Sequence, residues 1–209
     1  MILDVFTGCI GAGRFASGDT VVAGCWRSSP LGRFVDVMWV RPDGERVLLA
    51  PSAAAAELVG GLYTFDRTTV VAICGGWDGG AVAVAAGPVR LRLVASDRDW
   101  RSWLFAARPR ALRRRPAWLT LEDRLARPLV GRLIGGAEGV RAAGVAPGGA
   151  REWYGVDDYR AVAWGSLEVA GRDGGALLPL PADLGVGLSA FPTRPAVVHV
   201  GTLVERKSG

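Results

Sequence analysis

The sequence predicts a mainly β protein, α+β by strict count, built as an antiparallel β-barrel or sandwich with two or three short helices. Short segments rich in Val and aromatic residues, separated by Gly, Pro and Asp turns, fill residues 1–95 and return over 150–205. Several links between them are too short for a parallel crossover, which takes a dozen or more residues. Helical signals are concentrated near 97–134, so the regular alternation of a doubly wound fold is missing.

The first half of the chain contains the clearest strand signals. The expected strands are short apolar runs bounded by turn residues, at 21–26, 33–40, 46–49, 68–74, 81–85 and 89–94. Asp43 and Gly44 supply the backbone angles of a tight hairpin between the second and third of these strands. The glycine-rich segment 75–80 and the pair Gly87-Pro88 join later runs. We therefore expect antiparallel neighbours along this half of the chain.

The helices are predicted from their ends. Ser52 precedes an Ala-rich run that stops at two glycines, which indicates a helix of one or two turns. Ser96 with Asp99 three residues later is a capping-box pattern for a second helix. Apolar residues at helical spacing then predict a third helix, beginning at Thr120 and ending near 134.

The remainder of the chain returns to strands after a glycine-rich loop over 135–149. These expected strands lie at 152–156, 159–169, 176–178, 185–191 and 197–204. We find no repeat at a fixed period and no linker that would separate two domains. We expect one domain over 1–209, with strands over 1–95, a helical insertion over 96–134, the loop, and strands over 150–205.

Composition limits the class of protein. Half of the residues are apolar and 22% are charged, which suits a chain that folds by itself. No stretch approaches the roughly 20 apolar residues of a membrane span, and the first residues lack a signal-peptide pattern, so we expect a cytoplasmic protein. Cys9, Cys25 and Cys74 are widely spaced and accompany a single histidine. This pattern argues against a disulfide framework and a structural metal site, and we expect no cofactor.

Positive charge is concentrated in one segment. The formal net charge is +5, and residues 90–141 hold 13 arginines against 5 acidic residues. The Arg- and Trp-rich segment 97–118 allows two interpretations. If its tryptophans face the core, the arginines are a solvated rim; if they are exposed, the segment is an interaction surface for nucleic acid or an anionic membrane. The arginines concerned are Arg108, Arg110, Arg113, Arg114 and Arg115.

The opening segment carries a cluster of residues that invites comparison with nucleotide-type binding sites. An acidic residue, a phenylalanine and three glycines follow one another at Asp4, Phe6, Gly8, Gly11 and Gly13. This pattern resembles the first motif of cytosine-specific DNA methyltransferases, which holds S-adenosylmethionine. The resemblance covers about 13 of 209 residues, and the Pro-Cys pair that carries that family's nucleophile is absent. It implies a methyltransferase-like enzyme as a second alternative function.

Asp36 is the most informative polar residue of the predicted strands. Strict alternation places it on the face of Phe34 and Met38. A carboxylate on an apolar face has a raised pKa unless it is paired, and such a group suits a ligand contact or a general acid. The alternative is an ion pair with an arginine such as Arg46, or a position at a margin of the sheet.

His199 is the only histidine and alternates with apolar residues of the last expected strand. It titrates near neutral pH and so qualifies as an acid or a base, the alternative being a hydrogen-bonded or surface strand histidine. We assign no catalytic residue and favour a protein that is not an enzyme.

The leading functional hypothesis follows from the strand pattern, the eight tryptophans and the poverty of catalytic groups. It is a non-enzymatic binder of a small apolar molecule in a β-barrel cavity, and it leaves the oligomeric state open. The interaction surface on nucleic acid or an anionic membrane is the less favoured alternative. The expected ligand-binding residues are Asp36, Trp39, Tyr63, Trp153, Trp164 and Arg33.

Overall fold

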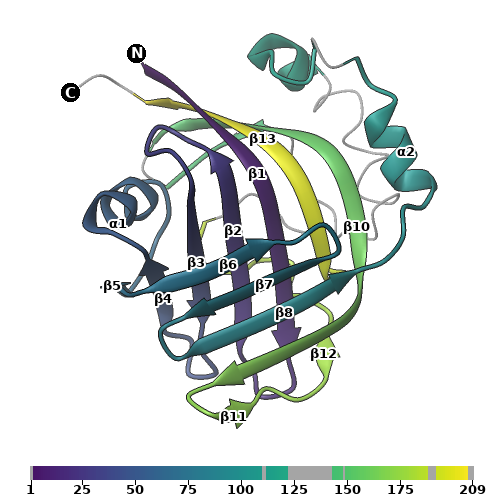
Figure 1. Cartoon of the computed structure of the whole chain (residues 1–209). Helices are drawn as coiled ribbons and strands as arrows, with labels where there is room; N and C mark the ends of the chain where they lie inside the picture. Colours follow the sequence, from purple (N-terminus) through teal and green to yellow (C-terminus); the bar gives the residue numbers. More distant parts are fainter. Residues whose placement is uncertain (1, 110–111, 122–142, 148, 188–191, 207–209) are drawn as a thin grey trace.

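The computed structural model describes residues 2–109, 112–121, 143–147, 149–187 and 192–206 (Figure 1). Its elements in chain order are β1 (Ile2–Phe15), β2 (Thr20–Ser28), β3 (Phe34–Val40), β4 (Arg46–Ala50), α1 (Ala53–Gly60), β5 (Arg67–Val70), β6 (Ile73–Trp77), β7 (Ala81–Ala86), β8 (Val89–Ala95), α2 (Trp100–Ala106), β9 (Ala143–Val145), β10 (Arg151–Val169), β11 (Arg172–Asp173), β12 (Leu177–Leu178) and β13 (Ala196–Arg206).

The strands form one sheet that curls into a half-barrel, which confirms the predicted fold class. Ten of them follow the order β5-β4-β3-β2-β1-β13-β10-β8-β7-β6. Among the described strands every pairing is antiparallel except that of β4 with β5, which α1 connects. The 19-residue β10 pairs with both β13 and β8 and so belongs to both halves of the sheet. As a result β6, β7 and β8 cross in front of β1, β2 and β3 (Figure 1).

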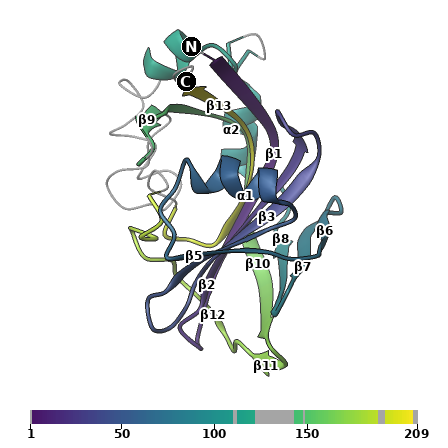
Figure 2. The same ribbon diagram turned by 90° about the vertical axis from the view of Figure 1, so that its left-hand side faces the viewer.

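The curl gives the sheet two apolar faces. The inner face packs residues such as Cys9, Val37 and Trp39 against Val82 and Leu93 of the crossing strands. The outer face is covered in part by α1, and Figure 2 shows α1 and the crossing strands on opposite sides of β1–β4. Because successive side chains of a strand point to opposite faces, neighbouring residues contribute to different cores.

The predicted hairpins are confirmed by the strand registers. β3 and β4 are joined through the Asp43-Gly44 turn, where Gly44 has φ +89°. The segment after β6 and the turn at Gly87 join further antiparallel pairs. Two expectations were wrong in their boundaries: 68–74 is divided between β5 and β6, and the two runs in 152–169 form one strand, β10.

The N-terminal glycines lie within a strand and form no ligand-binding turn. β1 runs without interruption through Gly8, Gly11 and Gly13 and pairs with β2 and β13. Gly8 sits at a register shift, where an added Cβ would overlap the backbone of Cys25. Close approach of backbone explains this glycine. The methyltransferase-like interpretation is therefore overturned.

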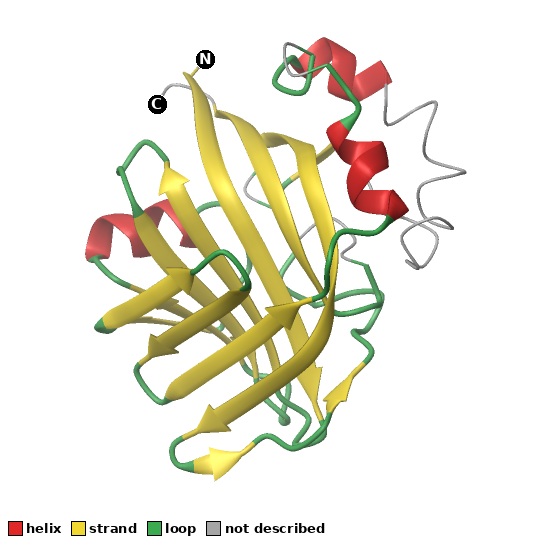
Figure 3. Cartoon of the chain, turned by 45° about the vertical axis from the view of Figure 1, so that its right-hand side comes forward, coloured by secondary structure: helices red, strands yellow, loops and turns green. Residues whose placement is uncertain are grey.

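The helices differ from expectation in detail (Figure 3). Ser52 caps α1 as predicted, accepting a hydrogen bond from the amide of Ala55. α2 is capped by Asp99, whose carboxylate accepts from two amides, and not by Ser96. Residues 116–121 are helical, so this helix begins four residues before the predicted start at Thr120, with Pro116 at the first helical position, where proline is favoured. The rest of the third expected helix lies outside the described residues. The expected strand over 185–191 is absent at 185–187, and 188–191 are not described.

No helix in the described part of the chain combines the length and apolar character needed to cross a bilayer.

Candidate functional site

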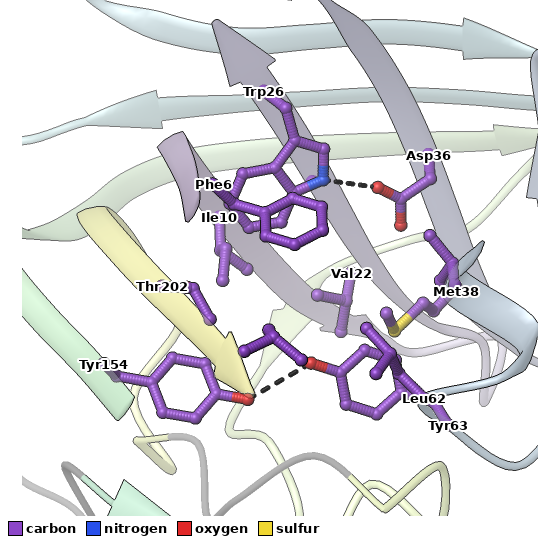
Figure 4. A pocket seen from close by; sticks show the side chains of 13 residues that line it. Phe6, Ile10, Val22, Trp26, Asp36, Met38, Leu62, Tyr63, Tyr154 and Thr202 are labelled. Atoms are coloured by element: carbon purple, nitrogen blue, oxygen red, sulfur yellow. Dashed lines mark hydrogen bonds between the residues drawn. The ribbon is translucent and has the colours of Figure 1, made fainter. Parts of the chain in front are cut away.

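An apolar cavity of about 30 Å³ lies on the outer face of the sheet, between the strands and α1 (Figure 4). Trp26 and Asp36 lie at one end, and Tyr63 and Tyr154 lie at the other. The complete lining is Phe6, Ile10, Val22, Gly24, Trp26, Asp36, Met38, Val59, Leu62, Tyr63, Tyr154, Thr202 and Val204.

Asp36 is a buried carboxyl group in this lining. Its side chain faces the cavity because residues 34, 36 and 38 of β3 share one face, and only 1% of the residue is exposed. The indole nitrogen of Trp26 donates a 2.7 Å hydrogen bond to Asp36 Oδ1. Burial raises the pKa of Asp36 to about 7, although that hydrogen bond opposes the rise. The group therefore changes protonation near neutral pH.

No arginine pairs with Asp36 among the described residues, so the ion-pair alternative is wrong. Arg46 instead forms an ion pair of 2.6 Å with Asp66, and this arginine holds the pKa of Asp66 well below its usual range. Asp36 also acts on the Cys25 thiol: contact with Cys9 and burial raise the pKa of that thiol, and the Asp36 carboxylate adds to the rise. The Asp36 end of the cavity is thus neutral or negative, and the described lining contains no arginine or lysine to compensate that charge.

Thr202 supplies an unsatisfied hydroxyl group in the same lining. It lies on β13, is 3% exposed, and its Oγ1 has no hydrogen-bond partner among the described residues. Leaving a buried hydroxyl without a partner costs roughly 1–3 kcal/mol. Because Thr202 lines the cavity, a polar group bound there is one way to supply the missing partner.

The far end of the cavity is closed by a hydrogen-bonded cluster of two tyrosines and a glutamate. Tyr63 donates to Glu152 Oε1 at 2.9 Å, and Tyr154 donates to Glu152 Oε2 at 2.7 Å. The two hydroxyl groups are 3.2 Å apart. Burial raises the pKa of Glu152 and of Tyr63. The cluster holds a carboxylate behind the cavity without a cation in the described part of the chain.

The other expected ligand-binding residues lie elsewhere. Trp39 packs in the inner core and donates a 2.7 Å hydrogen bond to Asp19, because an odd separation from Asp36 puts it on the opposite face. Trp153 packs against Leu119 and Leu203, and Trp164 is 54% exposed. Asp36 and Tyr63 are thus the only two of the six that line the apolar cavity.

A second hollow, the mouth groove, lies where β6 faces β1 and β2 at the open end of the half-barrel. It has two adjoining parts of about 570 and 590 Å³, which share Gly8, Arg27, Trp77 and His199. Arg33 lines the first part. The His199 ring meets Trp77 edge to face, with centroids 4.9 Å apart. Burial lowers the pKa of His199, and Asp158 opposes this shift.

The Arg- and Trp-rich segment is only partly a surface. α2 exposes Trp100 and Trp103, with the guanidinium groups of Arg101 and Arg98 over their rings. Arg113 is buried. Both Arg113 and Arg114 pair with Asp157 of β10, at 3.3 and 2.5 Å.

The remaining arginines of the predicted interaction surface differ in their surroundings. Arg108 donates to the carbonyl oxygens of Phe105 and Val156, Arg115 is exposed, and Arg110 lies outside the described residues. Three of the five arginines, Arg108, Arg113 and Arg114, therefore anchor the segment to β10.

Thr202, Trp26 and Tyr154 were not anticipated as site residues. Periodicity places each on a strand, but only the strand order shows that β2, β10 and β13 bring them to one cavity. In the described residues no group of His, Cys, Asp and Glu has the arrangement of a metal site.

Comparison with known proteins finds a weak structural likeness. No family model and no curated protein matches the chain. Among solved structures, the chain is similar to an acetoacetate decarboxylase from Legionella pneumophila, with 11% sequence identity and a TM-score of 0.39. The likeness covers 97% of this chain and 82% of that chain. The strand pairings described above, and not this likeness, define the fold.

Proposed function

We propose that the protein binds a small, largely apolar molecule carrying one hydrogen-bonding group, in the cavity between the sheet and α1. The observation that carries the proposal is the unpartnered hydroxyl of Thr202, a residue that lines the apolar volume. A ligand hydroxyl or carbonyl that met Thr202 would remove the cost of the missing hydrogen bond. The apolar remainder would contact Ile10, Val22 and Met38.

Asp36 supports the same ligand class. A carboxyl group that titrates near pH 7 presents either an acceptor or a donor to the cavity, depending on its protonation. A cationic ligand would also find a partner in the ionised form. The apolar lining nevertheless makes a charged ligand costly, because little else would replace its hydration.

The size of the cavity limits how a ligand enters. A volume of about 30 Å³ accommodates a water molecule, whereas ordinary ligand pockets are about ten times larger or more. Binding therefore requires side chains to move. Met38 is unbranched and adaptable, and Leu62 and Tyr63 lie in the segment that follows α1. Displacement of these three residues would enlarge the cavity without disturbing a strand pairing.

Phenol and toluene provide a matched pair of probes, since both are ring-sized and only phenol carries a hydroxyl group. We expect phenol to raise the melting temperature and to shift the Trp26 indole N–H resonance more than toluene does. Equal effects of the two probes, or no effect of either, would contradict the proposal.

Substitution of Thr202 should change ligand preference and stability in different directions. Thr202→Val keeps the shape and removes the unsatisfied hydroxyl, so we expect the variant to be more stable by about 1 kcal/mol and to lose its preference for phenol. The exposed Thr68 of β5 is the control: Thr68→Val should leave the preference unchanged. A Thr202→Val variant that still preferred phenol would exclude Thr202 as the contact.

A second candidate function is attachment to an anionic membrane surface through α2. The helix exposes Trp100 by 54%, Trp103 by 62% and Leu104 by 49%, next to Arg98 and Arg101. Exposed tryptophans beside arginines are typical of interfacial contacts. Co-sedimentation with phosphatidylserine vesicles should exceed that with phosphatidylcholine vesicles and fall in Trp103→Ala. Equal sedimentation of both vesicle types would reject this function.

A further inference from the structure

The mouth groove carries an excess of positive charge that no described residue neutralises. Six arginines and three aspartates line its two parts, which leaves a net charge of +3. Arg98 and Arg160 share the carboxylate of Asp158, at 3.0 and 3.3 Å. Arg27 and Arg33 form no ion pair within the described residues. The groove therefore attracts anions, and two guanidinium groups are uncommitted.

Asp158 provides a second and independent indication of a ligand. The residue is 5% exposed and lines the groove, and its Oδ1 has no hydrogen-bond partner among the described residues. Both arginine contacts go to Oδ2. A buried carboxylate oxygen without a donor is costly, so this atom calls for a donor from the groove.

Trp77 adds a flat apolar surface to the same groove. Trp77 lines both parts of the groove, meets His199 at 4.9 Å and lies under the Arg160 guanidinium group, 5.8 Å from its carbon. An aromatic face of this kind accepts the planar part of a small molecule.

We propose that the mouth groove binds a small aromatic carboxylate that also carries a hydroxyl group. The carboxylate meets Arg27, for which guanidinium geometry is well suited. The hydroxyl donates to Asp158 Oδ1, and the ring rests against Trp77. This site is separate from the apolar cavity, although Trp26 contributes to the lining of both.

His199 provides a clean readout because it is the only histidine in the chain. Its Cε1–H resonance is followed by NMR while mandelate, phenylacetate or phenylacetamide is added to the intact protein. Mandelate and phenylacetate share a ring and a carboxylate, and mandelate adds the hydroxyl; phenylacetamide keeps the ring without the charge. We expect saturable shifts in that order of affinity, with phenylacetamide about tenfold or more weaker than phenylacetate.

Variants identify the contacts. Arg27 is exposed, so Arg27→Gln should fold normally, as its circular dichroism will show, and should weaken mandelate binding about tenfold. Arg172→Gln, on β11 outside the groove, should have no effect. Equal binding of phenylacetamide and phenylacetate, or unchanged binding in Arg27→Gln, would overturn the anion site. Equal binding of mandelate and phenylacetate would overturn the contact with Asp158.

The mandelate test of the mouth groove is independent of the phenol test of the apolar cavity. Loss of the phenol preference in Thr202→Val tests the cavity, because Thr202 lines the cavity and neither part of the groove, whereas the His199 resonance reports the groove. Thr202→Val should leave mandelate binding unchanged.

Discussion

Trp26 donates its indole N–H to the buried carboxyl group of Asp36 across 2.7 Å, and the same tryptophan lines both the apolar cavity and the mouth groove. The two residues lie on adjacent strands, where Gly24 is directly opposite Asp36 and Trp26 is opposite Phe34. A Cβ at Gly24 would lie 2.6 Å from Asp36 Oδ1. The absence of a side chain at Gly24 therefore makes room for the contact.

Replacing Trp26 by Phe should destabilise the protein by about 1–3 kcal/mol, because Asp36 loses its donor. The loss should be larger at about pH 8 than at about pH 5, since only the ionised carboxylate depends on that donor. Denaturant unfolding at the two pH values provides the measurement. Trp164→Phe, at an exposed position, is the control; a Trp26→Phe effect independent of pH would show that the hydrogen bond does not support the charged form.

Asp36→Asn should change the pH dependence of stability. The folded pKa is about 7 and the ordinary value is 3.8, so the folded state binds more protons between these pH values and the wild type loses stability as pH rises through that window. The amide side chain of the variant cannot titrate. The variant should therefore gain stability relative to the wild type between about pH 4 and pH 7, by up to about 4 kcal/mol. Parallel pH profiles of the two proteins would contradict the raised pKa.

His199 should change stability with pH in the opposite direction to Asp36. Burial lowers its folded pKa, so the unfolded state binds more protons below about pH 6.5 and stability falls as pH decreases. His199→Gln should flatten this acid limb while leaving the limb due to Asp36 unchanged. NMR titration of the wild-type imidazole offers a direct check, and a pKa above 6.5 would be inconsistent with the prediction.

Tyr63→Phe and Tyr154→Phe should each destabilise the protein by about 1–3 kcal/mol, because Glu152 is buried and each tyrosine donates to one of its oxygens. Glu152→Gln should make the subsequent loss of either hydroxyl less costly, since the amide is neutral. A double-mutant cycle in urea measures this coupling. Strict additivity would mean that the tyrosines do not stabilise the carboxylate.

The three cysteines should differ sharply in reactivity. Cys74 is exposed, whereas Cys9 and Cys25 are buried opposite each other on β1 and β2. Contact with Cys9 is the main cause that raises the pKa of the Cys25 thiol, and burial is the second. The raised pKa suppresses the reactive thiolate. Mass spectrometry after iodoacetamide treatment should find one modified cysteine in the folded protein and three after unfolding. Rapid labelling of Cys25 in the native state would contradict the buried geometry.

Local patterns predicted much of the fold because they depend on neighbours in sequence. Asp43-Gly44 defined a hairpin, Ser52 defined a helix start, and alternation put Asp36 on an apolar face with Met38. Each inference needed only a turn preference, a cap or the period of a strand.

The candidate site was less predictable because it depends on contacts between distant strands. Tyr63 meets Glu152 across 89 positions, and Thr202 reaches the cavity through the pairing of β13 with β1. The N-terminal glycines suggested a cofactor-binding motif for a related reason. Gly8 is needed because β2 approaches β1 closely there, and this close approach cannot be inferred before the strand pairing is known.

The most direct test of the proposed function is a crystal structure of the protein grown with phenol. We expect density for one ring packed on Val22 and Met38, with its hydroxyl within hydrogen-bond distance of Thr202 Oγ1. A structure in which the cavity stays free of phenol while Thr202 Oγ1 bonds to the protein itself would contradict the account.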